Sequence, residues 1–274
     1  MLKYIIHSLR RKKARRHTKK YPTTVDTFAI SGYGNVLFAN WENPLVERKV
    51  ISSRNVNFFK KFLREGDLAI DIGGNIGHMT IPMALAVGRA GKILSFDPNP
   101  FVFEILQQNA GLNPLLTNIE TFNFAITENE EEFYYNSSEA SFNNGGISKD
   151  AESRHGRFAL DQKIQGINLE NFMRRNYINS IDKLKLIKID TEGYDKEIIR
   201  SIPGILDKYH PVVITECFKK NDAEQRYEQF DLLAGHGYSM YYFSDFDENA
   251  EIIPIVKKED MMRWKHFDLY AIHE

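Results

Sequence analysis

The sequence predicts an α/β protein with a doubly wound, mostly parallel sheet. This fold class is expected because apolar runs of strand length are followed by turns and helical patterns. Such units occupy residues 68–87, 91–109 and 184–202. Further strands are predicted at residues 119–126, 211–216, 238–243 and 267–272. Alternation of this kind is typical of parallel sheets covered by helices on both faces.

The first of these units contains a glycine turn. Residues 68–72 form the expected strand, Gly73, Gly74 and Gly77 follow it, and a helix is expected to about residue 87. Glycine has no Cβ atom, so the turn can bend sharply and let the backbone approach a ligand closely. The unit therefore predicts a ligand-binding β-loop-α element.

Asp71 narrows the choice of ligand for this turn. A dinucleotide would place its pyrophosphate at the start of the following helix, where the carboxylate would repel it. The G-x-G-x-x-G spacing of dinucleotide sites is also absent. A carboxylate here suits a ligand that carries an ammonium and a sulfonium group. S-adenosylmethionine is such a ligand.

A second acid ends the next predicted strand. Asp97 closes the run 91–97, and Pro98 and Pro100 separate it from a helix expected over 101–109. In nucleotide-binding α/β folds an acid at this position accepts hydrogen bonds from ribose hydroxyls. We expect Asp97 to bind a ribose.

Four motifs of the chain recur in one known family. They are Asp-Ile-Gly-Gly-Asn-Ile-Gly at 71–77, Phe-Asp-Pro-Asn-Pro at 96–100, Asn109 with Asn113, and Leu-Ile-Lys-Ile-Asp-Thr-Glu-Gly at 186–193. They resemble the FkbM family of class I S-adenosylmethionine-dependent methyltransferases, and the last motif is specific to it. The resemblance covers roughly residues 66–216. Asp97 and Asp195 stand where the family commonly has glutamate, and both keep the carboxylate.

The resemblance implies a Rossmann-like sheet of seven strands that binds S-adenosylmethionine. It also places adenine near the end of the third strand, at Ala125. With the two acids above, the residues expected to bind the cofactor are Asp71, Gly73, Gly74, Asn75, Gly77, Asp97, Asn99, Ala125 and Asp190.

A second group of acids accompanies the family-specific motif. Asp190 and Glu192 follow the predicted strand 184–189, and Glu216 ends the strand 211–216. Parallel strands place such residues at the edge where open α/β sheets bind ligands. We expect Asp190, Glu192 and Glu216 to be catalytic, with Asp190 or Glu192 taking the proton of an acceptor hydroxyl. Alternatively, Asp190 and Glu216 hold Mg²⁺, which prefers oxygen ligands.

The chain divides into three expected parts. Residues 1–22 form a basic N-terminal tail, residues 23–64 form a hairpin and a helix that cover the core, and residues 65–274 form the methyltransferase domain. The hairpin is expected at 28–38 and the helix at 47–63.

An insertion is expected within the domain, at about residues 127–166, because this segment is too long for a plain connection. The family places an irregular β-type insertion over the active site at this point. Acceptor contacts are therefore expected from some of Asn143, Ser148, Arg154, His155 and Arg157.

The amino-acid composition limits the classes of protein to which this chain can belong. The 274 residues are 42% hydrophobic and 27% charged, as in an ordinary globular protein, and contain no apolar stretch of membrane-spanning length. The single cysteine, Cys217, excludes an internal disulfide framework and fits a cytoplasmic protein. The apolar part of the tail is too short for a signal-peptide core.

Charge is distributed unevenly. Residues 1–22 carry nine lysines and arginines and no acid, so the remainder, with 27 basic and 37 acidic residues, has a net charge of −10. The tail is either a solvated extension or a contact for anionic lipid, which would make the protein membrane-peripheral. Nucleic acid is the third partner class, and the acidic remainder disfavours it.

Together these features predict an S-adenosylmethionine-dependent O-methyltransferase that acts on a hydroxyl of a sugar or glycoconjugate. Another small molecule, such as a polyketide hydroxyl, and nucleic acid are the alternative acceptors. A cofactor-binding scaffold without catalysis is an alternative of a different class. The sequence specifies no oligomeric state.

Overall fold

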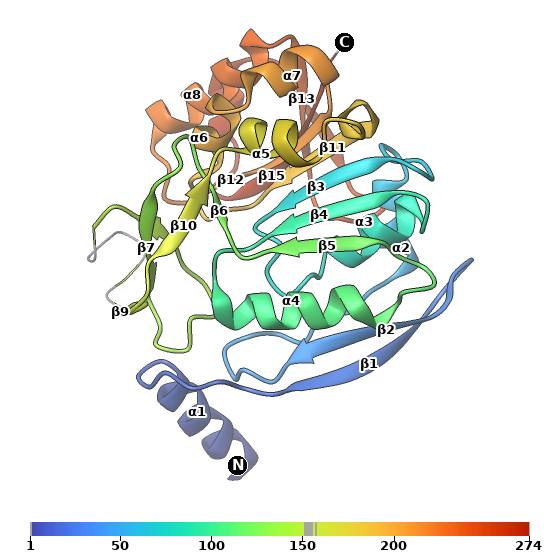
Figure 1. The fold of residues 1–274 in the computed structure, drawn as a ribbon. Coiled ribbons are helices and arrows are strands. Elements are labelled where there is room, and N and C mark those ends of the chain that lie inside the picture. The colour runs from blue at the N-terminus through green and yellow to red at the C-terminus, as the bar shows by residue number, and fades with distance from the viewer. Residues whose placement is uncertain (1, 151–155, 157, 274) are drawn as a thin grey trace.

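The computed structural model describes residues 2–150, 156 and 158–273. Its centre is an eight-stranded sheet with the order β14-β13-β15-β12-β11-β3-β4-β5 (Figure 1). The strands are β3 (Leu68–Ile72), β4 (Lys92–Phe96), β5 (Ile119–Phe122), β11 (Leu184–Ile189), β12 (Val212–Cys217), β13 (Tyr238–Phe243), β14 (Ile252–Ile255) and β15 (Phe267–His273). Strands β5, β4, β3, β11 and β12 are parallel, and β15 runs antiparallel between β12 and β13. The predicted fold class is confirmed, and β14 extends the expected seven strands at one edge.

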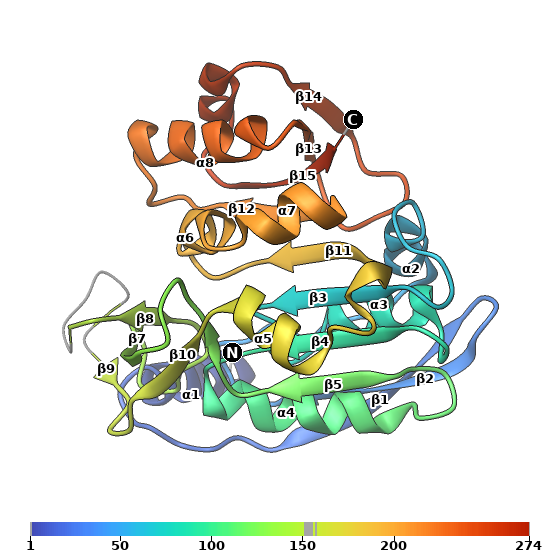
Figure 2. The ribbon, with the colours of Figure 1, turned by 45° about the horizontal axis from the view of Figure 1, so that its top comes forward.

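Helices cover both faces of this sheet (Figure 2). The helices are α1 (Leu2–Ala14), α2 (Ser53–Phe59), α3 (Thr80–Val87), α4 (Pro100–Leu112), α5 (Leu169–Asn176), α6 (Asp195–Arg200), α7 (Pro203–Tyr209) and α8 (Ala223–Gly235), with the 3-10 turns η1 (Ile181–Lys183) and η2 (Lys258–Met262). Helices α2, α3 and α4 contribute to one hydrophobic core, and α5 to α8 contribute to the other. The sheet is therefore doubly wound.

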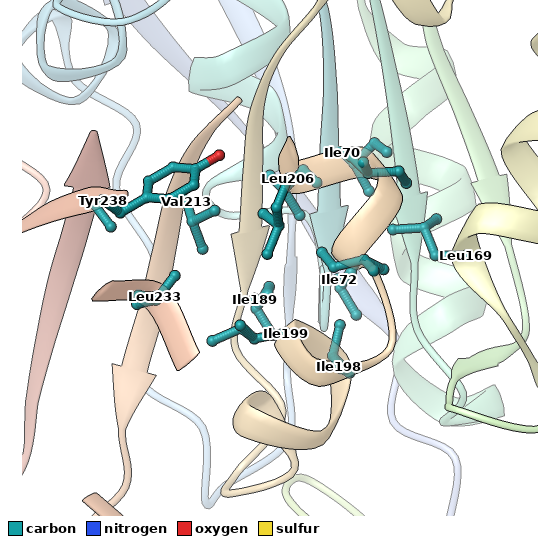
Figure 3. Packing of buried hydrophobic residues seen from close by; sticks show 14 of the residues in the cluster. Ile70, Ile72, Leu169, Ile189, Ile198, Ile199, Leu206, Val213, Leu233 and Tyr238 are labelled. Carbon is teal, nitrogen blue, oxygen red and sulfur yellow. The ribbon is translucent and has the colours of Figure 1, made fainter. Parts of the chain in front are cut away.

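The central strands are apolar on both faces because both faces are covered. All five residues of β3 are buried, and Ile70 and Ile72 belong to one cluster with Ile198 and Ile199 of α6 (Figure 3). Asp71 is buried on the same strand. A buried carboxylate costs free energy unless it is paired, so this position requires a partner at the end of the strand.

An antiparallel hairpin precedes the core. Its strands are β1 (Thr23–Ile30) and β2 (Gly34–Trp41), longer than the expected hairpin. Asn109 of α4 and Asn113, which caps the end of this helix, hold β2 to the core. The side chain of Asn109 accepts a hydrogen bond from the backbone N–H of Ala39 and donates one to its carbonyl, and Asn113 does the same with Leu37. These motif residues therefore dock the hairpin.

The helix expected over 47–63 is wrong at both ends. Helix α2 begins at Ser53 because Ser52 and Asn55 form a capping box, in which Ser52 Oγ accepts a hydrogen bond from Asn55 N at 3.3 Å. Residues 47–52 are irregular instead.

A smaller sheet lies beside the end of the main one (Figure 1). Its strands are β6 (Ala125–Ile126), β7 (Glu132–Ser137), β8 (Gly146–Ser148), β9 (Phe158–Ala159) and β10 (Ile164–Ile167). Their order is β6-β10-β7-β8, and β9 also pairs with β7. The single strand expected over 119–126 is therefore wrong, because β5 joins the main sheet and β6 joins the smaller one.

The basic tail contains the helix α1, and Arg15, the residue after this helix, is attached to the connection between β7 and β8. The backbone N–H of Ala140 donates to the carbonyl of Arg15 at 3.2 Å, and Arg15 Nε lies 3.2 Å from Glu139 Oε1. Across the part of the chain that is described, every helix is too short or too polar to cross a bilayer.

Candidate active site

A cavity of about 310 Å³ lies at the carboxyl ends of β3, β4 and β11. Parallel strands commonly bind ligands at this edge, because their end loops meet there. The glycine turn, residues 124–126, insertion residues 143–147, the loop 190–194 and residues of the segment 46–49 contribute to its wall. The cavity thus brings Asp71 and Asp97 together with Asp190 and Glu192.

Most of the expected site residues line this cavity. They are Asp71, Gly73, Gly74, Asn75, Asp97, Ala125, Asp190 and Glu192. Gly77, Asn99 and Glu216 are not among the lining residues, so their expected roles stay predictions.

The glycine turn is packed too tightly for side chains. A Cβ atom at Gly73, whose φ is +79°, would lie 1.8 Å from the carbonyl oxygen of Asp190, and one at Gly74 would lie 2.2 Å from Ser95 Oγ. The N–H groups of both glycines donate to the carbonyl of Phe96, at 2.9 and 3.0 Å. The two glycines therefore allow the ends of β3, β4 and β11 to meet beneath the cavity.

A buried lysine joins the two groups of acids. Lys188 Nζ lies 3.1 Å from Asp190 Oδ2 and 3.4 Å from Asp71 Oδ1, and only 4% of its side chain is exposed. The other oxygen of Asp71 accepts a hydrogen bond from Thr80 Oγ1 at 2.5 Å. Burial alone would lower the pKa of Lys188, but the charges of Asp190 and Asp71 outweigh burial and hold this pKa above its ordinary value. Lys188 is therefore charged and compensates for both carboxylates.

Asp97 organises the backbone around the cavity. Its Oδ2 accepts a hydrogen bond from Asn75 N at 2.7 Å, and its Oδ1 accepts one from Asn99 N at 2.9 Å. Burial raises the pKa of Asp97 to about 7, although these two donors oppose the rise. Each carboxylate oxygen has a second lone pair, so Asp97 can also accept a hydrogen bond from a ligand hydroxyl.

A buried carboxylate holds the loop after β11. Asp195 Oδ2 accepts hydrogen bonds from Thr191 Oγ1 at 2.8 Å and from Thr191 N at 3.3 Å. Its Oδ1 accepts from Thr215 Oγ1 at 3.1 Å and from Glu216 N at 3.2 Å. The loop is thereby fixed to the end of β12, and Glu192 within the loop has a defined position.

Glu192 has an uncommon backbone conformation. Its φ of +56° lies in the left-handed region that favours glycine, and Gly193 follows with a φ of +100°. Burial is the main cause that raises the pKa of Glu192, and the nearby charge of Asp190 adds to it. A carboxyl group with a raised pKa on a cavity wall is suited to accept a proton near neutral pH.

Glu216, which is expected to act with Asp190 and Glu192, is not among the residues that line the cavity. Its Oε1 lies 2.5 Å from His266 Nε2, and its Oε2 is buried without a hydrogen-bond partner among the described residues. Burial, with the surrounding acids, raises the pKa of Glu216 to about 10. The raised pKa makes the protonated form of Glu216 easier to populate than that of an ordinary glutamate.

The alternative of a metal ion on Asp190 and Glu216 has no support in the arrangement of the described side chains. Among the residues that the structure describes, no group of three or more histidine, cysteine, aspartate or glutamate side chains is arranged to hold a metal. The ammonium group of Lys188 already supplies a positive charge beside Asp190.

Gly77 and Asn99 have structural roles. Gly77, with a φ of +90°, closes the turn, and a Cβ there would lie 3.2 Å from Leu106 Cδ1. Asn99 Oδ1 caps α4 by accepting a hydrogen bond from Phe101 N, and its Nδ2 donates to the carbonyl of Phe142 at 2.7 Å. The protein itself therefore engages both polar atoms of this side chain.

The insertion closes one side of the cavity. Asn143, one of the expected acceptor contacts, lines it together with Asn144, whereas Ser148 does not. The remaining expected contacts lie outside the described residues; they are Arg154, His155 and Arg157.

A comparison with known protein families identifies the family to which this chain belongs. The model of the methyltransferase FkbM domain matches residues 71–253, from the strand that carries Asp71 to beyond Glu216. The chain belongs to this family. Its cavity is therefore the cavity of an FkbM methyltransferase domain.

Individual proteins are similar to this FkbM chain at low identity. The methyltransferase sdnD of Sordaria araneosa is 22% identical over 154 residues, which are 48% of this chain and 59% of that protein. The chain thus spans little more than half of the relative's length. The structure of methyltransferase FkbM from Methylobacillus flagellatus KT has a TM-score of 0.44 and 13% identity, over 77% of this chain and 44% of that chain. An S-adenosylmethionine-dependent O-methyltransferase from Thermotoga maritima has a TM-score of 0.44 and 14% identity, over 92% and 78%.

Sequence reasoning missed two residues of the FkbM site. Lys188 lies in the buried part of β11, unlike the exposed Lys185, and a lysine in a strand buried on both faces is expected only where it is paired. That pattern could have identified it. The sequence identified Asp195 only as an aspartate where the family commonly has glutamate. The residues around Asp195 do not indicate its hydrogen bonds to β12, because those partners are remote in sequence.

The FkbM cavity fits S-adenosylmethionine in its chemistry. Asp71 and Asp190 suit a ligand with ammonium and sulfonium charges, and Asp97 suits ribose hydroxyls. Phe124 and Ala125 provide apolar surface for adenine. These residues would hold the cofactor.

Proposed function

We propose that this FkbM-family protein transfers the methyl group of S-adenosylmethionine to a hydroxyl group, with a sugar or glycoconjugate as the acceptor. The observation that carries the proposal is the shared cavity, which joins the glycine turn and Asp97 to the loop with Asp190 and Glu192. Groups suited to the cofactor and a group suited to accept a proton therefore border the same space.

When bound, S-adenosylmethionine supplies an electrophilic methyl group on a positively charged sulfur. Glu192 would accept the proton of the acceptor hydroxyl, since the raised pKa of its carboxyl group brings it closer to neutral pH. Asp190 is held by Lys188 at 3.1 Å and provides negative charge beside the cationic ligand. Asp195 fixes the loop before the acceptor arrives.

The insertion side of the cavity favours a hydroxylated acceptor. Asn143 and Asn144 line it, and an amide group can donate to one hydroxyl while it accepts from another. A polyketide hydroxyl could use the same base and is the second candidate. The net charge of −10 outside the tail disfavours nucleic acid. A scaffold without catalysis would need no proton acceptor on the cavity wall, so Glu192 favours an enzyme.

Calorimetric titration tests the cofactor. We expect the purified protein to bind S-adenosylmethionine and not NAD. Asp97→Ala should weaken this binding about 10–100-fold, because it removes charged hydrogen-bond acceptors from the ribose position. Asp231→Ala is the matched control, since Asp231 is exposed on α8, and it should bind like the wild type. Binding of NAD in place of S-adenosylmethionine would refute the assignment.

A screen for release of S-adenosylhomocysteine tests the acceptor. We expect release with mono- and oligosaccharides and none with RNA or DNA. If polyketide alcohols alone support release, the second candidate replaces the first. Release with nucleic acid alone would overturn the acceptor class.

We also propose that the basic helix α1 binds anionic membrane surfaces. Residues 10–13 are four exposed bases at its end, and Leu9 is 59% exposed beside them. Basic residues near an anionic membrane contribute about 1 kcal/mol each. The protein should therefore sediment with phosphatidylserine vesicles, and a variant with glutamine at residues 10–13 should stay in the supernatant. Equal sedimentation with neutral phosphatidylcholine vesicles would contradict the proposal.

A further inference from the structure

The cavity wall carries more acidic side chains than lysines. Four carboxyl groups line it, from Asp71, Asp97, Asp190 and Glu192. They suit the cationic groups of S-adenosylmethionine, but the amino acid part of this cofactor also carries a carboxylate. A buried carboxylate needs a cation or several N–H donors. The wall must therefore offer a cation or several N–H donors at the place where this carboxylate lies, and a lysine side chain can supply both the charge and the donors.

Two lysines line the cavity, and one of them is already engaged. Lys188 Nζ lies 3.1 Å from Asp190 Oδ2 and 3.4 Å from Asp71 Oδ1. Lys49 has no ion-pair partner within the described part of the chain. Of the two lysines, Lys49 is thus the one that can pair with a ligand.

His78 does not compete with Lys49 for this role. It lines the cavity too, but burial lowers the pKa of His78 to about 4, and the charge of Lys49 acts in the same direction. The ring is neutral at neutral pH. Lys49 and His78 both line the cavity, and His78 contacts the carbonyl of Val50, the residue after Lys49.

The backbone of Lys49 is held in place. Asn40 Oδ1 accepts a hydrogen bond from Lys49 N at 2.7 Å, and Asn40 Nδ2 donates one to the backbone carbonyl of Lys49 at 2.9 Å. The carbonyl of the next residue, Val50, lies 3.0 Å from His78 Nε2. The irregular segment before α2 is thereby attached to the start of α3, beside the glycine turn.

This position corresponds to one end of the cofactor. The nucleoside is expected beside Asp97 and Ala125, so the amino acid part lies toward Asp71 and His78. We infer that Lys49 binds the carboxylate of the amino acid part of S-adenosylmethionine. The inference rests on the proposed cofactor and adds the residue that recognises its anionic group.

Two nucleosides that differ in the amino acid test the inference by calorimetry. S-adenosylhomocysteine carries the carboxylate, and 5′-methylthioadenosine lacks the amino acid entirely. Lys49→Met should weaken S-adenosylhomocysteine about ten-fold or more, because it removes a charged hydrogen-bond donor, and should leave 5′-methylthioadenosine unchanged. Lys49→Arg keeps the charge and should stay within about three-fold of the wild type for both.

Lys185→Met is the matched control. Lys185 is exposed at the opposite end of β11, so this variant changes the net charge equally and should bind both nucleosides like the wild type. Equal effects of Lys49→Met on both nucleosides, or no effect on either, would overturn the inference. A wild-type protein that binds neither nucleoside would overturn the proposed cofactor itself, and the inference with it.

Discussion

Replacing Glu192 with glutamine is expected to lower the turnover number by about 10²–10⁴-fold, the usual contribution of a positioned base. Glutamine keeps the shape of the side chain but cannot take the acceptor proton. Binding of S-adenosylmethionine should change little, because the ribose position and the glycine turn are untouched. Turnover is measured as S-adenosylhomocysteine release with the best saccharide from the screen. Glu251→Gln, at an exposed position, serves as the control.

The pH dependence of turnover gives a second measurement on Glu192. Only the ionised carboxyl group accepts a proton, and the pKa of this group is raised by burial and by Asp190. Turnover should therefore rise with pH through this pKa, at higher pH than for an ordinary glutamate, and Glu192→Gln should lack the rise. If Glu192→Gln keeps wild-type turnover and Asp190→Asn abolishes it, Asp190 is the base instead.

Replacing Gly73 with alanine is expected to destabilise the protein by roughly 3–5 kcal/mol and to abolish cofactor binding. The added Cβ would lie 1.8 Å from the carbonyl oxygen of Asp190, which is backbone and cannot rotate away. The φ of +79° adds further strain for any residue with a Cβ. The ends of β3 and β11 would have to separate. Urea unfolding and titration with S-adenosylmethionine measure both effects.

Gly111→Ala is the matched control for this substitution. Gly111 lies in α4, and a Cβ there would meet no heavy atom within 4 Å. Alanine should stabilise the helix by about 0.5–1 kcal/mol, because glycine loses more backbone entropy on folding. A Gly73→Ala protein with wild-type stability and affinity would show that the turn tolerates a wider separation of the strands than its geometry indicates.

The sequence predicted the architecture well, because strand and helix patterns are local. The apolar run of β3, the glycine turn and the stop at Gly235 after α8 are each visible within a few residues. The helix predicted over 47–63 begins too early, because the cap at Ser52 sets the first residue of α2. Strand β6 was missed because its partner, β10, lies at the far end of the insertion.

The site was predicted less completely than the fold. Asp71, Asp97, Asp190 and Glu192 line one cavity, as strand-end positions in a parallel sheet suggest. Glu216 occupies the equivalent position on the next strand, yet its side chain pairs with His266 from near the end of the chain. Nothing in the sequence around Glu216 indicates that contact.

The sequence by itself determined the fold class, the family and the positions of the acids along the chain, because short-range patterns and motifs encode them. Only the tertiary structure decided which acids share a cavity and which cation each one faces. Lys188 joins Asp71 to Asp190 across two strands, and Asp195 ties the β11 loop to β12. The charge and hydrogen-bonding state of a buried group depend on neighbours that are remote in sequence, and the packing of the sheet brings those neighbours within reach.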